Sequence, residues 1–293
     1  MLPRIGITVG DPAGIGPEVA QKAADSGRFD HRAELHVLGL PAHPVTPGRL
    51  DPECGRMAVE TVRAAVDQCL AGELDAIVTG PINKYAVEMA GIPFSGHTEF
   101  IASLCGSPEV RMMLASDRLR VVHVTTHVSL ADACRRATAD RIFTTIELAA
   151  RGLLLLGLPS CRIAVAGLNP HCGESGLFGL EDRDQINPAV ERASAAGHNV
   201  TGPVSPDTVF HRAAAGEFDI VVAMYHDQGH IPSKLIAFDE TVNVTLGLPI
   251  IRTSVDHGTA FDIAGKGVAN PTNMICAIEM ALRLVENSPS TGP

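Results

Sequence analysis

Short apolar runs that end abruptly in polar residues recur along the chain. The clearest is Ile220–Val222, which is followed at once by Tyr225, His226 and Asp227 in a strongly polar stretch. A short β-branched run of this kind predicts a buried strand of a parallel sheet. Comparable runs predict further strands within residues 4–9, 34–40, 75–84, 119–126, 161–167 and 243–252, the last interrupted by Gly-Leu-Pro.

Apolar residues recur at helical spacing in other segments. Residues 55–71 and 272–286 show this periodicity, and further helices are expected onward from Val19 and from near Phe100. Strands that alternate with helices predict an α/β fold. The last residues, 287–293, are expected to fray.

Histidines follow three of the expected strands. His127, His171 and His226 each stand just beyond one of them. In open α/β sheets, ligands bind beyond the carboxyl ends of the strands. Three imidazoles at one edge of a sheet can converge on one ion, as in three-ligand catalytic sites. The pattern therefore indicates a metal site, against the alternative that each histidine is a satisfied loop residue.

A second histidine, His230, follows His226 by four residues. On a helix the two rings would share one face, as in zinc proteases. Gly229 and Pro232 oppose a helix here, and in an extended chain residues four apart lie about 13 Å from each other. We therefore expect a non-helical segment in which at most one of the two histidines binds a given metal.

Composition limits the class of protein. The chain has 293 residues, 45% of them hydrophobic, which is enough for about two domains with sizeable cores. Its net charge of −10 argues against nucleic acid as the main partner. No apolar run is long enough for a membrane span and no signal-peptide pattern opens the chain, so a cytoplasmic location is expected. The seven cysteines form no Cys-x-x-Cys pair, which indicates neither a disulfide framework nor a zinc knuckle.

Three polar loops each allow two interpretations. The glycine-rich turn over residues 10–18 lacks the third glycine of a dinucleotide fingerprint, so it either lines a cleft or only starts a helix at Pro17. Asn83 and Lys84 either contact a ligand or cap the next helix. Thr98, in the stretch 95–99, is a candidate N-cap at a helix start that either holds an anion or is a plain capping turn.

Taken together, these motifs resemble the 4-hydroxythreonine-4-phosphate dehydrogenase family of vitamin B6 synthesis, over residues 4 to about 286. The resemblance is carried by Gly-Asp-Pro-x-Gly-Ile-Gly-Pro-Glu (10–18), Thr-Gly-Pro-Ile-Asn-Lys (79–84), Gly-His-Thr-Glu (96–99), Asn-Pro-His-x-Gly-Glu (169–174), Tyr-His-Asp-Gln-Gly (225–229) and Asp-His-Gly-Thr-Ala (256–260). It implies an isocitrate/isopropylmalate dehydrogenase-like α/β fold with two α/β domains flanking an active-site cleft. The expected domains are a cofactor-side domain (1–120 plus 240–293) and a metal, substrate and dimerisation domain (121–239).

The resemblance also implies roles for single residues. The implied metal ligands are the trio already singled out, His127, His171 and His226. The implied substrate contacts are His97, Thr98, Lys234, Asn243 and Arg252. Asp227 and Lys234 are the candidates for the catalytic base. The stretch from His257 looks like the adenosine-binding loop of isopropylmalate dehydrogenase, and its expected cofactor contacts are His257, Gly258, Thr259, Ala260, Asp262 and Asn270.

The expected reaction is NAD-dependent, metal-dependent oxidation, with decarboxylation, of a 4-phosphorylated 3-hydroxy acid such as 4-hydroxy-L-threonine 4-phosphate. Asp262 favours NAD over NADP because a carboxylate repels a 2′-phosphate. The metal is Zn, Co, Ni, Mn or Mg, and the family's site is completed across a homodimer interface.

Several alternatives remain open. The continuation through His230 and the short chain look more like a second branch, which oxidises 4-phospho-D-threonate or 4-phospho-D-erythronate in sugar-acid catabolism. A third branch oxidises a cyclic dihydrodiol dicarboxylate. Alternatives from other classes are a metal-dependent hydrolase using His226 and His230, and a non-catalytic ligand-binding protein.

Overall fold

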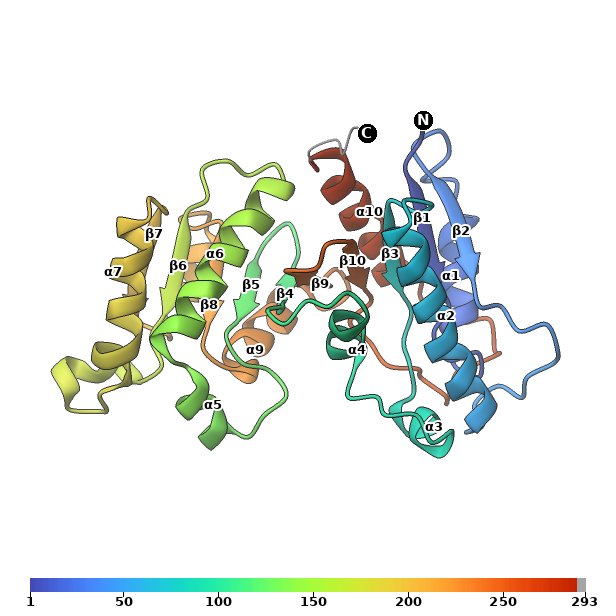
Figure 1. Cartoon of the computed structure of the whole chain (residues 1–293), viewed down its shortest axis with the longest axis horizontal. Coiled ribbons are helices and arrows are strands. Elements are labelled where there is room, and N and C mark those ends of the chain that lie inside the picture. Colours follow the sequence, from blue (N-terminus) through green and yellow to red (C-terminus); the bar gives the residue numbers. More distant parts are fainter. Residues whose placement is uncertain (289–293) are drawn as a thin grey trace. The chain divides into compact units, whose positions relative to one another are not determined.

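The chain divides into two compact α/β units (Figure 1). In the computed structural model, which describes residues 1–288, unit 1 comprises Met1–Val110 with Val242–Pro293 and unit 2 comprises Arg111–Thr241. The expected fraying of residues 287–293 lies for the most part outside the described residues. Each unit is built around strands and helices of its own.

The unit 1 strands run in the order β2, β1, β3, β10, β9. The first four are parallel, and β9 is antiparallel to β10. The segment 243–252 thus forms two strands rather than one, because the Gly-Leu-Pro stretch turns the chain back. The bounds are β1 Arg4–Thr8, β2 Glu34–Leu38, β3 Ala76–Thr79, β9 Val242–Leu246 and β10 Ile251–Ser254.

The unit 1 helices lie close to their expected positions. They are α1 Gly16–Ala24, α2 Pro52–Leu70, α3 Lys84–Met89, α4 His97–Leu104 and α10 Thr272–Glu286. α2 begins earlier than its periodicity predicted because the side chain of Asp51 accepts from the Glu53 amide and Pro52 occupies the first turn. One core cluster joins α2 to β3 and α4 through Val62, Val66, Leu74, Ile77 and Ile101.

The unit 2 strands run in the order β4, β5, β8, β6, β7. β4 is antiparallel to β5, and the other neighbours are parallel. β4 and β7 were not anticipated. The bounds are β4 Arg111–Ala115, β5 Arg120–His123, β6 Ile163–Ala166, β7 Val200–Val204 and β8 Ile220–Ala223.

The helices of unit 2 include the two that follow β5 and β8, which lie at the same edge of the sheet (Figure 1). Its core cluster joins β5, β6 and β8 through residues such as Val121, Ala164 and Val221. The helical segments are α5 Leu130–Arg136, α6 Ala139–Leu155, η1 Pro170–Gly176, η2 Asp182–Ile186, α7 Asn187–Ala195, α8 Val209–Ala214 and α9 His226–Ala237.

The expectation that the segment after His226 is non-helical was wrong, because α9 contains both Gly229 and Pro232. A Cβ built on Gly229 would lie 2.4 Å from Nε2 of His123 on β5, so glycine is what lets the helix approach the strand. The missing amide of Pro232 removes one helical hydrogen bond. The hydroxyl of Ser233 donates to the Gly229 carbonyl at 2.8 Å, so this turn keeps a bond of its own. Tertiary packing here outweighs local propensity.

Within residues 1–288, none of the helices has the length and apolar character that crossing a membrane requires.

Candidate active site

The three singled-out histidines follow three neighbouring strands of unit 2. β5, β8 and β6 are adjacent and parallel, and they lead to His127, His226 and His171 respectively. Parallel strands present their carboxyl ends at one edge of the sheet. The structure therefore brings these three loops to the same edge.

Two side chains tie these strand ends together. The Thr125 hydroxyl donates to the Met224 carbonyl at 2.8 Å. The Gln228 amide accepts from the Met224 amide at 2.6 Å and donates to the Gly167 carbonyl at 2.7 Å. Both side chains are buried, so each bond satisfies a backbone group that water does not reach. Gln228 thus fixes the start of α9 against the ends of β8 and β6.

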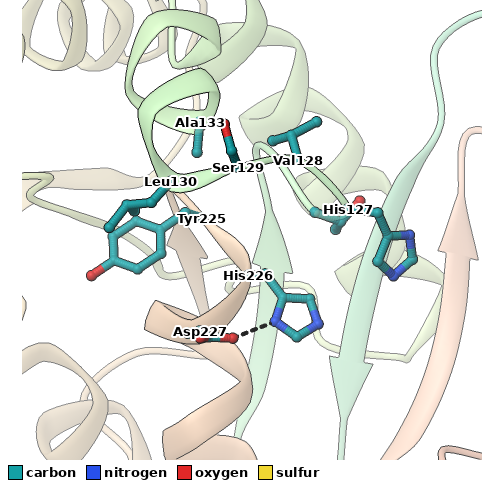
Figure 2. A pocket seen from close by; sticks show the side chains of 9 residues that line it. His127, Val128, Ser129, Leu130, Ala133, Tyr225, His226 and Asp227 are labelled. Carbon is teal, nitrogen blue, oxygen red and sulfur yellow. Dashed lines mark hydrogen bonds and ion pairs between the residues drawn. The ribbon is translucent and has the colours of Figure 1, made fainter.

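A pocket of about 420 Å³ opens beside the ends of β5 and β8. Figure 2 shows the rings of His127 and His226 next to each other, and their centroids are 5.9 Å apart. The Asp227 carboxylate lies 2.6 Å from Nδ1 of His226, on the side away from His127 in this view. The pocket lining consists of Thr126, His127, Val128, Ser129, Leu130, Ala133, Tyr225, His226 and Asp227.

The bond to Asp227 determines which nitrogen of His226 is available. A carboxylate accepts, so Nδ1 of His226 carries the hydrogen and Nε2 of the neutral ring keeps its lone pair. Metal-bound and proton-accepting imidazoles are commonly oriented in this way. Because α9 is helical, His230 stacks on His226, with centroids 3.6 Å apart and planes 13° apart.

His171 stands on an unusual loop. Residues 171–175 all have positive φ, between 42° and 80°, and the His171 side chain is exposed. Asp182, which is 1% exposed, holds the start of this loop by accepting from the amides of Leu168 and Asn169 at 2.9 and 3.0 Å. Such backbone strain persists only where neighbouring groups support it.

In the part of one chain that the structure describes, no three His, Cys, Asp or Glu side chains form a group that could hold an ion. His127 and His226 are brought close together, and within residues 1–288 of a single chain they have no third ligand. Lys234 lies two turns further along α9, with Nζ 5.0 Å from the centroid of the Phe238 ring.

Unit 1 contains a second candidate cluster, centred on Arg252. Its side chain is 2% exposed. Two of its nitrogens donate to the Thr79 hydroxyl at 3.1 and 2.7 Å, and a third donates to the Thr245 hydroxyl at 2.9 Å. Burial lowers the pKa of Arg252 to about 9. The hydroxyls that it contacts are neutral, and the negative charge of Glu99 raises the pKa of Arg252, against the larger effect of burial.

His97 and Lys84 extend this cluster. Burial, and then the charges of Arg252 and Lys84, hold the pKa of His97 well below its usual range. Nε2 of His97 is buried without a hydrogen-bond partner. A Cβ on Gly96, the N-cap of α4, would lie 2.9 Å from a carboxylate oxygen of Glu99 and 3.8 Å from Nζ of Lys84, so both side chains stand at the start of α4. A helix start with cations beside it favours an anionic ligand.

The remaining expected substrate residues have distinct settings. Thr98 was expected as the N-cap of α4, but the helix begins at His97 and has no side-chain cap. Asn243 lies on β9 beside β10, and its Oδ1 atom is buried without a partner. Asn83 accepts from the amides of Tyr85 and Ala86 at 3.0 and 3.2 Å. Of its two interpretations, it therefore has the role of a cap, at the start of α3.

The loop from His257 to Asn270 is anchored on α1. The Ile15 amide donates to the Thr259 carbonyl at 3.0 Å, and Glu18 accepts from the Ala269 amide at 2.7 Å. Asn270 accepts from the amide and hydroxyl of Thr272, at the start of α10. Asp262 is exposed on this loop, and Gly258 has nothing within 4 Å of the place a Cβ would take. Ala260 has a φ of 41°.

Sequence patterns did not identify Thr79, Thr245, Gln228, Asp182 or His123. Thr79 lies in the motif at 79–84 and Gln228 in the motif at 225–229. Their presence in these motifs was the sequence signal that could have identified them. Thr245 lies inside the expected strand segment 243–252, seven residues from its partner Arg252. The partners of Asp182 and His123 lie further along the chain than one turn or strand pair, so local periodicity carries no information about them.

Comparisons with known proteins agree with these features. A family model described as pyridoxal phosphate biosynthetic protein PdxA matches residues 13–281. The chain is 45% identical to a 4-hydroxythreonine-4-phosphate dehydrogenase of Desulforapulum autotrophicum, over 95% of this chain and 94% of the relative. It is 44% identical to a D-threonate 4-phosphate dehydrogenase of Cupriavidus necator, over 97% of each chain.

Solved structures extend the likeness to the fold. A 4-hydroxythreonine-4-phosphate dehydrogenase from Klebsiella pneumoniae aligns with a TM-score of 0.87 at 41% identity, over 97% of this chain and 98% of that one. An isocitrate dehydrogenase from Methylococcus capsulatus aligns with a TM-score of 0.55 at 17% identity, over 96% of this chain and 85% of that one. The second likeness concerns the fold alone, and it confirms the expected isocitrate dehydrogenase-like α/β class.

Proposed function

Because the chain belongs to the PdxA family, as its motifs indicated, we propose that it is an NAD-dependent dehydrogenase of a 4-phosphorylated 3-hydroxy acid. The first substrate we propose is 4-hydroxy-L-threonine 4-phosphate. A specific observation favours a second candidate, D-threonate 4-phosphate, because relatives of almost equal identity carry that name.

The observation that carries the proposal is the buried guanidinium of Arg252, which donates hydrogen bonds to the neutral hydroxyls of Thr79 and Thr245. Burying a charge without a compensating partner costs free energy of folding. An anionic substrate would give the guanidinium the charged partner that the two hydroxyls do not supply. A planar guanidinium suits a carboxylate or phosphate, with which it forms paired hydrogen bonds.

We assign the phosphate to the start of α4, where backbone amides, Lys84 and His97 lie. The unpartnered Oδ1 of Asn243 would accept from a substrate hydroxyl or amine. We assign Lys234 to an anionic end of the substrate as a point charge, and Thr98 to a hydroxyl contact.

The oxidation removes a hydride and a proton from the carbon and oxygen of one secondary alcohol. The hydride goes to the nicotinamide of NAD, and the hydroxyl proton goes to a base on the enzyme. Asp227 and Lys234 remain the two candidates for that base. Asp227 holds Nδ1 of His226, which would leave Nε2 of that ring with its lone pair for a ligand. Loss of CO2 from the resulting 3-oxo acid completes the proposed reaction.

The exposed loop at residues 257–262 is the proposed adenosine site. Gly258 has space above its Cα, and the Asp262 carboxylate is exposed where it could accept from ribose hydroxyls. His257, Thr259 and Ala260 belong to the same loop, and Asn270 holds its far end at α10. We propose NAD rather than NADP on this basis.

We also propose a divalent ion such as zinc and a homodimer in the cytoplasm. When bound, the ion would lower the pKa of the substrate hydroxyl and stabilise negative charge on its oxygen. The donor chemistry of His226, with Nδ1 on Asp227, suits such an ion. Since one chain assembles no group of three ligands among its described residues, the proposed set of His127, His171 and His226 would draw on a second copy.

The decisive experiment follows absorbance of reduced nicotinamide while the purified protein is given NAD and a panel of substrates. The panel contains 4-hydroxythreonine phosphate, phosphothreonate, phosphoerythronate and a cyclic dihydrodiol dicarboxylate. We expect signal with one of the first three and its loss after chelation, restored by a divalent metal. Hydrolysis of a phosphoester without reduction of NAD would instead support the hydrolase alternative.

A further inference from the structure

A buried histidine, His123, lies next to the pocket histidines and has no role in the proposed function. It ends β5 and is 1% exposed. Its Nδ1 atom is 3.3 Å from the carbonyl oxygen of Met112, and its Nε2 atom is 3.1 Å from Nδ1 of His230. The same Nδ1 of His230 is 3.1 Å from the carbonyl oxygen of His226. Two imidazoles and two carbonyls form one connected network.

These contacts decide which nitrogen of each ring carries hydrogen. The Met112 carbonyl only accepts, so Nδ1 of His123 donates. Burial lowers the pKa of His123 to about 3, so its ring is neutral and Nε2 accepts. Nδ1 of His230 must then donate, and the His226 carbonyl independently requires the same. Neutral His230 therefore carries its hydrogen on Nδ1.

The packing of α9 depends on the same contact. Gly229 leaves the space that the His123 ring fills, because a Cβ there would collide with Nε2 of His123. With the helix at this distance, His230 reaches His123 on one side and covers the ring of His226 on the other, nearly parallel to it. His226 is thus bounded by the His230 ring and by the Asp227 carboxylate.

We propose that His123 and His230 are positioning residues for His226. The hydrogen bond from His230 to His123 holds the His230 ring, and the held ring stacks on His226 and stops it from turning away from Asp227. Nε2 of His226 is thereby kept available to a ligand in the pocket. This inference rests on the proposed function, because it takes His226 as a site residue.

The test is the tautomeric state of each ring, read from long-range nitrogen–proton correlations of the histidine-labelled protein without substrate or metal. We expect the spectra to show the tautomer with hydrogen on Nδ1 for both His226 and His230. The signals of each ring are assigned by substituting that histidine. Hydrogen on Nε2 of His230 in the native protein would overturn the proposal. The tautomers are read in the native protein. Only the variants that assign the signals have to fold.

Matched variants separate positioning from simple packing. His123→Phe keeps the ring but removes the acceptor that holds His230, so we expect a mixed tautomer at His226 and about a tenfold lower kcat with little change in KM. His123→Gln retains an acceptor and a donor, and we expect it to restore both. If His123→Phe leaves the tautomer and kcat at native values, the positioning role is refuted.

A second pair of variants tests the stacking. His230→Phe retains a flat ring over His226, whereas His230→Leu does not, so only His230→Leu should give mixed tautomers at His226. Equal spectra for the two variants would contradict the stacking role. If no substrate in the panel is oxidised, the proposed function fails, and these spectra of the ligand-free protein still decide the positioning separately.

Discussion

Two nitrogens of Arg252, Nε and Nη2, donate to a single oxygen, the hydroxyl of Thr79, at 3.1 and 2.7 Å. Both side chains are buried, and Thr79 is neutral. The pair orients the guanidinium without neutralising it. A carboxylate in place of Thr79 would satisfy the charge internally and remove the attraction for an anionic substrate.

Arg252→Met should separate activity from stability. We expect kcat/KM to fall by about a hundredfold or more, because hydrogen bonds to charged groups contribute about 1.5–3 kcal/mol each. The free energy of unfolding should stay the same or rise, because the cost of burying the charge is removed. Steady-state kinetics and urea unfolding measure the two effects. The control is Arg56→Met, on the exposed face of α2, which should change neither kcat/KM nor the free energy of unfolding. A strongly destabilised Arg252→Met would contradict this account.

Gln228→Leu should destabilise unit 2. The substitution leaves the Met224 amide and the Gly167 carbonyl without their present partner in a buried place. Each unsatisfied group costs about 1–3 kcal/mol, so we expect a loss of about 2–4 kcal/mol in urea unfolding. Gln21→Leu, whose side chain is exposed, should lose little. Equal stability of the two variants would show that the strand ends do not depend on Gln228.

Leu235→Glu should disrupt the proposed homodimer. Ile231 and Leu235 of α9 and Phe238, the C-cap after it, form an apolar stripe at 57%, 82% and 68% exposure, with the spacing of one helix face. An exposed stripe of this kind favours a partner surface. Light scattering should show a monomer for Leu235→Glu and a dimer for the control Leu70→Glu, at an exposed leucine of α2. A dimeric Leu235→Glu would place the interface elsewhere.

Asp219 should make stability depend on pH. Burial alone would raise its pKa, but bonds from Arg162 and Ser160 outweigh this and lower it from 3.8 to about 2. The stabilisation is therefore complete above about pH 4 and is lost as the pH falls through 2. Asp219→Asn should cost about 2 kcal/mol at pH 7, since one pKa unit corresponds to about 1.4 kcal/mol, and much less near pH 2. The control is Asp140→Asn, on the surface, measured by urea unfolding at both pH values. If Asp219→Asn lowered the free energy of unfolding equally at both pH values, the link between stability and protonation of Asp219 would be contradicted.

Asp262→Ser should weaken the preference for NAD. Removing the carboxylate removes the repulsion of a 2′-phosphate and the acceptor for the ribose hydroxyls. We expect the ratio of kcat/KM for NAD over NADP to fall by about tenfold or more. Asp30→Ser, an exposed substitution elsewhere in unit 1, should leave the ratio unchanged. A native protein that prefers NADP would overturn the cofactor assignment.

Local sequence predicted those elements whose signal is local. The terminal helix was expected at 272–286 and is found over Thr272–Glu286, because its apolar period and its starting residues lie within the helix itself. The strands at 4–9 and 161–167 were likewise found, as Arg4–Thr8 and Ile163–Ala166. The placement of the three histidine loops at one edge of the sheet also followed, since each loop leaves a parallel strand at its carboxyl end. That their strands are neighbours is seen only in the sheet order.

The sequence by itself determined the α/β class, the family and the strand ends that carry the histidines, because hydrophobic periodicity and contiguous motifs are properties of short stretches. Only the tertiary structure decided that α9 is a helix, that His123 supports His230, and that hydroxyls from residues 79 and 245 surround Arg252. The physical reason is that burial and hydrogen-bond partners are set by segments far apart in the chain. A glycine that opposes a helix in isolation is required in this one by the ring it packs against.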